Sequence, residues 1–518
     1  MTVPTSSPAH SPPPPAPAVS PWAAWLDRRI WVLLLLGFSA GLPILLIFSS
    51  LSLWLGEAGV ERKAVTYFSW AALGYSFKFV WAPLVDRLPL PGLTPWLGKR
   101  RSYLLLAQAG VMLAIVGMAM TDPSQGVSAL TQMAWFAVLL GFSAATQDIA
   151  IDAYRIEVAS PELQGMLSSS YIAGYRIAMV LAGAGVLLLA GHLGSSKGSY
   201  LYVAWKSAYL VMAACMVVGM LTTLLMREPY RAPSPSEPWS AHARLMLVFA
   251  AAVLAFVGVF SHSAPLLDWG KIGPLLGLLQ EVIRLSLALG AAALAAWALV
   301  GLGLARSDTV QTTWVGPAQD FFNRYGRRTA WLLLALIGTY RISDIVLGVI
   351  SNVFYQDMGY SKEDIAFAVK TFGVVLSIAG SFFGGMLVMR LGVMRSLFWG
   401  ALLSSLTNLG FVLLAYHGTD VVLMYSVVAA DNLAGGFASA AFVAMLSGLV
   451  NVSFTATQYA IFSSLMTLLP KTLGGYSGTL VDALGYPGFF TFTALIGLPV
   501  LLLVAVASRI EIGQTPHE

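Results

Sequence analysis

The sequence predicts an all-helical membrane protein made of two similar six-helix bundles, with two extra membrane-spanning helices between them. Three observations predict this. Hydrophobic residues make up 58% of the 518 residues and charged residues only 10%, with a mean hydropathy of +0.77, whereas soluble domains carry about 25% charged residues. The apolar residues form runs of membrane-spanning length. The two ends of the chain also share short strings at one constant offset.

Runs of about 20 apolar residues are long enough to cross a bilayer as helices. The chain contains fourteen such runs in the order six, two, six. They cover residues 30–55, 64–85, 102–121, 129–153, 166–191 and 203–226, then 244–262 and 276–304, then 330–355, 365–389, 395–416, 421–450, 455–480 and 486–507.

The breaks between the runs divide the chain into five parts. We expect a cytoplasmic tail (1–21), a first bundle (22–228), a linker holding the extra helix pair (229–328), a second bundle (329–508) and a second tail (509–518). The first tail is rich in proline and lacks the apolar stretch of a signal peptide, so it reads as disordered. The end of the linker, 306–328, has the pattern of an amphipathic helix lying on the cytoplasmic membrane surface.

Lys and Arg gather in alternate loops, which fixes the predicted topology. One set of loops carries Arg28, Arg29, Arg87, Lys99, Arg100, Arg101, Arg227, Arg231, Arg324, Arg327, Arg328, Arg390, Arg395 and Arg509. Positively charged loops stay on the cytoplasmic side, so both termini are predicted to be cytoplasmic. The same rule accounts for the modest excess of 29 Lys and Arg over 24 Asp and Glu, and we expect no nucleic-acid partner.

The two bundles resemble each other in sequence. Residues 141–145 read GFSAA and residues 436–440 read GFASA, and the serine pair 168–169 recurs at 463–464 with the same offset of 295. An even number of helices per repeat keeps both halves in one orientation, which is the parallel repeat of the major facilitator fold. Such a fold places a substrate site between the halves, near the middle of the membrane.

Two aspartates in the fourth predicted span are the strongest functional signal. Asp148 and Asp152 share a helix face, and each acid costs roughly 2.5–3.5 kcal/mol at the bilayer centre. Close carboxylates in a poor dielectric repel, which favours keeping one protonated near neutral pH. We therefore predict a proton-coupling site at Asp148 and Asp152, with Lys78 as partner of the ionised form. Asp148 is favoured as the carrier because Arg155 stands three residues after Asp152 and can pair with it.

The second bundle has Val443 and Ser447 at the positions equivalent to the two acids. The acids are therefore peculiar to the first half and are not part of the duplicated scaffold.

Other polar residues inside the spans predict a site for an anionic substrate. Arginine forks and a lysine suit carboxylates, while amide and hydroxyl groups suit sugars. The candidate substrate-binding residues are Gln147, Tyr175, Arg176, Arg341, Asp344, Lys370, Asp431 and Asn432. The alternative for any one of them is a buried ion pair that only ties helices together.

The loop after the second span carries a candidate cytoplasmic gate. Asp86 and Arg87 precede an insertion rich in proline, and Arg101 follows it. This arrangement is similar to the facilitator loop signature, whose ion pairs lock the two halves together in the outward-facing state.

Catalysis is not indicated. The six histidines show no metal-ligand spacing, and there is no glycine-rich phosphate loop. We predict that the chain is not an enzyme and uses no metal or cofactor, with protons as the coupling ion. The one cysteine, Cys215, cannot form a disulfide within the chain.

Longer strings resemble the anhydromuropeptide permease (AmpG) family. They are Gly37–Pro43 (GFSAGLP), Phe77–Arg87 (FKFVWAPLVDR), Ala145–Ala153 (ATQDIAIDA), Gly174–Arg176 (GYR), Asp431–Gly436 (DNLAGG) and Ser453–Gln458 (SFTATQ). They run in order through all twelve core helices. Some members of that family carry their extra helix pair after the core, whereas here it lies in the linker.

The resemblance implies a monomeric importer in the bacterial inner membrane, driven by the proton motive force. Its substrate would be N-acetylglucosaminyl-1,6-anhydro-N-acetylmuramyl peptide from cell-wall recycling, and the family's permease also feeds the signal that induces β-lactamase. Two alternatives stay open. One is an acetyl-CoA transporter, whose more highly charged substrate asks for more cations. The other is a muropeptide sensor that does not translocate, which usually carries a soluble output domain.

Overall fold

The computed structural model describes residues 26–60, 73–196, 198–230, 238–266 and 274–509. These residues are helical apart from turns, loops and one isolated bridge between Ser196 and Ser199. Thirteen of the described helices are long and apolar enough to cross a membrane. The predicted all-helical membrane class is therefore confirmed. The two predicted tails lie outside the described residues except for Arg509, as does the first part of the predicted span 64–85.

The first bundle contains ten described α-helices before the linker, besides short 3₁₀ turns and the π-helical turn η5 (Leu181–Gly185). They are α2 (Arg28–Ile47), α3 (Ser49–Glu57), α5 (Leu73–Phe77), α6 (Ala82–Arg87), α7 (Thr94–Leu97), α8 (Lys99–Ala119), α9 (Val127–Glu157), α10 (Gln164–Val180), α11 (Val186–His192) and α12 (Tyr202–Leu225). Helices α2 and α10 pack unusually close because glycines face the opposing backbone. A Cβ atom on Gly174 would overlap the carbonyl oxygen of Leu34.

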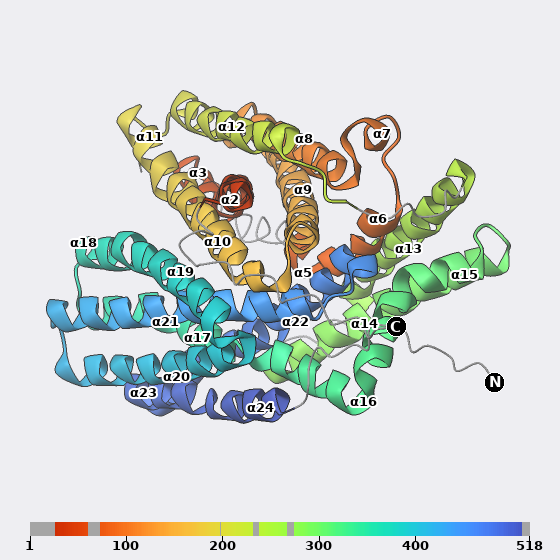
Figure 1. Ribbon diagram of the computed structural model, residues 1–518. Helices are drawn as coiled ribbons and strands as arrows, with labels where there is room; N and C mark the ends of the chain where they lie inside the picture. Colours follow the sequence, from red (N-terminus) through yellow and green to blue (C-terminus); the bar gives the residue numbers. More distant parts are fainter. Residues whose placement is uncertain (1–25, 61–72, 197, 231–237, 267–273, 510–518) are drawn as a thin grey trace, which may run out of the picture.

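The linker forms the extra helix pair and a bent connection to the second bundle. Its elements are α13 (Trp239–Leu266), α14 (Pro274–Gly301), α15 (Ser307–Val310), the π-helical turn η6 (Gln311–Val315) and α16 (Gly316–Thr339). Helices α13 and α14 pack against each other at the side of the molecule (Figure 1).

Helix α16 is kinked at Gly326, whose φ is +71°. The residues before the kink form the helix predicted for 306–328. Its apolar face packs on protein, because Phe321 is 3% exposed and its ring contacts that of Phe462 with centroids 5.1 Å apart.

The second bundle repeats the pattern of the first. Its main elements are α17 (Ile342–Asp357), α18 (Lys362–Ile365), the π-helical turn η7 (Ala366–Phe372), α19 (Gly373–Leu391), α20 (Val393–His417), α21 (Val421–Gly448), α22 (Thr455–Gly474), α23 (Ser477–Leu495) and α24 (Leu498–Ser508). The eleventh core helix ends at Gly474, earlier than the predicted 480, because the chain turns at Gly475 and Tyr476. A second break follows at Gly485, with a φ of +67°.

The two bundles lie on opposite sides of the molecule and meet along a central seam (Figure 1). On the described residues, the seam is formed by α10 against α19 and α21, and by α22 against α5, α6 and α9. The seam contacts of Asp86, Arg155 and Gly385 lie toward the helix ends that carry the basic loops.

Candidate functional site

Breaks in three core helices place the predicted cationic residues. Lys78 begins a 3₁₀ turn, η2 (Lys78–Val80), between α5 and α6. Arg341 stands between α16 and α17 with non-helical dihedral angles, and Lys370 lies inside the π-helical turn η7. Discontinuous spans are a common way for transporters to build a site near the membrane midplane. The side chain of Lys370 is outside the described part of the structure.

Lys78 pairs with Asp152 and not with Asp148. Its Nζ atom lies 3.7 Å from Oδ2 of Asp152, and Nη2 of Arg155 lies 3.4 Å from Oδ1 of the same carboxylate. Asp152 therefore sits between two cations. Within the described residues Asp148 makes no ion pair, and its carboxylate accepts one long hydrogen bond, 3.4 Å, from the hydroxyl of Tyr171.

Gln147, a predicted substrate-binding residue, contacts α2 inside the first bundle. Its side chain is fully buried, and its Nε2 donates to Oγ of Ser39 in α2 at 2.8 Å. Its Oε1 atom is buried and has no partner among the described atoms. This hydrogen bond connects α9 to α2, so in this structure the Gln147 side chain contributes to helix packing.

Cations from both bundles approach each other across the seam. Arg176 of α10 and Arg341 are close enough for their like charges to interact, and Tyr175 lies beside Arg176. Arg341 is held by Asp344, with 3.0 Å between Nε and Oδ2, and by Oγ of Ser439 at 2.5 Å from Nη1. Both arginines are only partly buried. An anion placed between them would meet two guanidinium groups.

Two further candidates lie on α21 in the second bundle. Asp431 interacts electrostatically with Asp344 and Arg341. Asn432 donates from Nδ2 to the carbonyl oxygen of Val428 at 2.9 Å, which leaves its Oδ1 for another donor. The structure thus brings one arginine and two carboxylates together in this half.

The predicted gate residue Asp86 joins the two bundles. Its carboxylate accepts the backbone N–H groups of Ala456 at 3.1 Å and Thr457 at 2.8 Å, and the Thr457 hydroxyl at 2.8 Å. These amides open α22, so a carboxylate from the first bundle caps a helix of the second. Nη2 of Arg100 lies 2.9 Å from Oδ1 of the same carboxylate.

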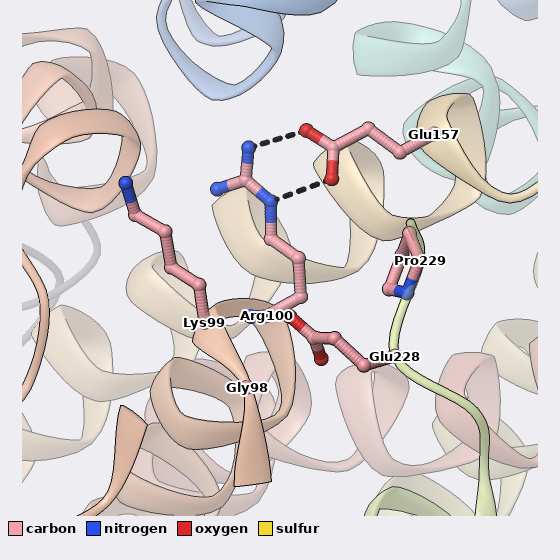
Figure 2. A pocket seen from close by; sticks show the side chains of 6 residues that line it. All are labelled: Gly98, Lys99, Arg100, Glu157, Glu228 and Pro229. Atoms are coloured by element: carbon pink, nitrogen blue, oxygen red, sulfur yellow. Dashed lines mark hydrogen bonds and ion pairs between the residues drawn. The ribbon is translucent and has the colours of Figure 1, made fainter. Parts of the chain in front are cut away.

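Arg100 is the centre of the charge network behind this cap. Its guanidinium also forms a two-pronged pair with Glu157, with distances of 3.0 and 2.5 Å (Figure 2). The side chain is 1% exposed. Glu228 completes the pocket by accepting the backbone N–H groups of Arg100 and Arg101 at the start of α8, at 2.7 and 3.0 Å. Burial raises the pKa of Glu228 above its ordinary value.

The other two predicted gate residues point elsewhere. Arg101 donates to the carbonyl oxygens of Thr223 and Leu224, inside the first bundle. Arg87 donates to Oγ1 of Thr312 at 2.8 Å and of Thr313 at 3.0 Å, in the linker. The contact between the bundles is made by Asp86 itself, and the basic residue that pairs with Asp86 is Arg100 and not Arg101. The sequence did not single out Arg100. Which of three consecutive basic residues faces Asp86 depends on the rotation of α8.

Two further contacts close the same end of the seam. Arg155 of α9 donates to Oγ of Ser447 at 2.7 Å, and its guanidinium lies over the ring of Tyr459 at 5.1 Å. Helices α10 and α19 cross at Gly165 and Gly385, where a Cβ on Gly385 would lie 2.8 Å from the Gly165 carbonyl oxygen.

No group of three or more His, Cys, Asp or Glu side chains suited to a metal ion occurs in the described part of the chain. The absence of a metal or cofactor stays a prediction.

Comparison with known proteins identifies the scaffold. The chain is 29% identical over 478 residues to AmpG 4 of Rickettsia conorii, covering 92% of this chain and 96% of that protein. It is 28% identical over 482 residues to the anhydromuropeptide permease of Escherichia coli, covering 93% and 80%. A family model described as Acetyl-coenzyme A transporter 1 matches residues 29–192.

Solved structures agree on the fold. A double-tryptophan mutant of XylE matches with a TM-score of 0.58 at 12% identity, over 93% of this chain and 98% of that one. A bacterial homologue of the iron transporter ferroportin in an outward-facing state matches with a TM-score of 0.55 at 13% identity, over the same shares. These matches confirm the resemblance predicted from the motifs: the chain is a membrane transporter of the major facilitator fold and a homologue of the anhydromuropeptide permeases.

Proposed function

We propose that this protein is a proton-coupled importer of N-acetylglucosaminyl-1,6-anhydro-N-acetylmuramyl peptides in a bacterial inner membrane. The observation that supports the proposal is that Arg176 and Arg341, one from each bundle, are close enough for their charges to interact. Like charges close together inside a membrane protein are costly. Arg341 is paired with Asp344, whereas Arg176 makes no ion pair among the described residues, so an anionic substrate would supply its counterion. A disaccharide bearing peptide carboxylates supplies such a counterion.

The proton path is proposed to run through Asp148. Asp152 has Lys78 and Arg155 as counterions and can stay ionised, whereas among the described residues Asp148 makes no ion pair and accepts a hydrogen bond from the hydroxyl of Tyr171. A carboxylate without a counterion in a poor dielectric binds a proton more readily than a paired one. Asp148 can therefore exchange a proton while Asp152 keeps Lys78 in place.

Alternating access follows from the closed seam. If the basic loops are cytoplasmic, as the positive-inside rule indicates, the cap of Asp86 on α22 seals the cytoplasmic end, and substrate enters from the opposite side. Release requires this cap and the Arg155 contacts to separate. Both termini would then be cytoplasmic.

An acetyl-CoA transporter is a second candidate, favoured by the family model that matches residues 29–192. The number of cations argues against it, because a phosphate-rich substrate asks for more than the pair at the seam. Thermal unfolding of the purified protein with each ligand separates the two. We expect stabilisation by anhydromuropeptide, lost in Arg341→Ala. Stabilisation by acetyl-CoA alone would overturn the substrate assignment.

A further inference from the structure

The linker touches the first bundle beside the proposed proton site. The side chain of Trp314, in η6, donates from Nε1 to the carbonyl oxygen of Val80 at 3.1 Å. Val80 ends the 3₁₀ turn that begins with Lys78. One hydrogen bond therefore connects a linker residue to the backbone that carries the partner of Asp152.

The Val80 carbonyl is available because the helix is broken there. Pro83 has no N–H to donate, and the N–H of Leu84 donates to the carbonyl of Trp81 at 3.0 Å. The two residues that usually satisfy a helical carbonyl at this position therefore do not serve Val80. A buried carbonyl left without a donor costs free energy. The indole N–H supplies that donor and so stabilises the bend.

The indole is itself held from several directions. Its ring stacks on Phe249 of α13, with centroids 6.1 Å apart and planes within 10°. Two residues before it, Thr312 accepts from Arg87 at the end of α6. A few residues after it, the Pro317 carbonyl and Asp320 accept from Nε2 of Gln458 in α22, each at 2.8 Å. The segment from Ser307 to Tyr325 thus links α13, α6 and α22.

We propose that this segment is a strap across the closed end, and that Trp314 is a positioning residue for Lys78. The strap holds the bend of the second core helix through Val80, and the bend sets Lys78 opposite Asp152. The extra helix pair anchors the strap through Phe249. This proposal rests on the proposed proton-coupled import and gives the linker helices a role in it.

The test compares Trp314→Phe, which keeps an aromatic ring on Phe249 but removes the N–H, with Trp331→Phe as a matched control. Trp331 lies on α16 with a side chain 65% exposed, packed against Phe322. Both variants are first checked for an unfolding temperature close to that of the unchanged protein, so that loss of folding is separated from loss of positioning.

The first readout needs no substrate. Hydrogen–deuterium exchange of peptides covering 73–87 should quicken by about 2- to 12-fold in Trp314→Phe, the range set by one ordinary hydrogen bond. Trp331→Phe should leave it unchanged. Equal exchange in Trp314→Phe and the unchanged protein would overturn the proposal, whatever the substrate proves to be.

The second readout measures transport in proteoliposomes. Accumulation of labelled anhydromuropeptide driven by a proton gradient should fall in Trp314→Phe, while exchange of internal for external muropeptide, which needs no gradient, persists. A role confined to folding would lower both in step and would overturn the proposal. Absence of muropeptide transport in the unchanged protein would instead refute the proposed function and leave the exchange result as the test of the strap.

Discussion

Nζ of Lys78 lies 3.7 Å from Oδ2 of Asp152, one helical turn away from the acid that we propose carries the proton. The pair joins the broken second core helix to the fourth, and Arg155 extends it toward the second bundle. Among the described residues, Asp152 has a fixed ion pair and the neighbouring Asp148 has none. The proposed function gives the two acids different roles: Asp152 keeps the helices in register and Asp148 exchanges the proton.

The contribution of the Lys78–Asp152 pair to stability can be measured separately from its contribution to transport. Lys78→Met leaves Asp152 with Arg155 alone, so we expect lower thermal stability and loss of gradient-driven uptake. The double variant Lys78→Met/Asp152→Asn should regain part of the stability, with a coupling free energy of about 0.5–3 kcal/mol, because residue 152 no longer carries a buried charge that has lost one of its two cations. Its uptake should stay low. Additive stability losses would show that the two residues do not interact.

Asp344 should act as a competitor for the substrate carboxylate, because it holds Nε of Arg341 at 3.0 Å. Asp344→Asn removes its charge, so muropeptide should bind more tightly. Arg341→Ala should weaken binding by roughly 10- to 150-fold, the worth of a charged hydrogen bond. Calorimetric titration of both variants measures the two effects. Equal weakening in both variants would mean that Asp344 supports binding and does not compete.

Loss of the Asp86 cap should open the basic-loop end. Asp86→Asn removes the charge that caps α22 and pairs with Arg100, so the open population should rise by roughly 10- to 150-fold. A cysteine at Ala460, which is 2% exposed, reports opening through its rate of thiol labelling in a Cys215→Ser background. Asp122→Asn is the control, because Asp122 caps a short turn in another loop. Unchanged labelling in Asp86→Asn would contradict the gate.

Alanine substitutions at two glycines should have different effects: one should change the balance between closed and open states, and the other should impair folding. Gly385→Ala inserts a methyl group 2.6 Å from Oγ of Ser169 and 2.8 Å from the Gly165 carbonyl oxygen, across the seam. It should disfavour the closed state by about 1–3 kcal/mol and quicken labelling at the Ala460 position, with the bundles intact. Gly174→Ala, which collides with Leu34 inside one bundle, should reduce folded yield. If Gly385→Ala reduced the folded yield and did not quicken labelling, Gly385 would matter for folding and not for closure of the seam.

The sequence predicts the class and order of helices well because hydrophobicity and loop charge follow from residue type alone. It does not predict the helix breaks at Lys78 and Arg341. Pro83 is a visible signal for the first, but no proline marks the second, where local propensity gives way to packing. The contact partners of single side chains are harder still to predict from the sequence. Asp152, not Asp148, receives Lys78, and Gln147 turns toward Ser39, because helix rotation decides each contact.

The most direct test of the central claim is uptake of labelled anhydromuropeptide into proteoliposomes with and without an inward proton gradient, for the unchanged protein and Asp148→Asn. We predict that the gradient drives accumulation in the unchanged protein only, while Asp148→Asn exchanges muropeptide without concentrating it. Equal accumulation in all four conditions would contradict proton coupling through Asp148, and no uptake in any of them would contradict the substrate.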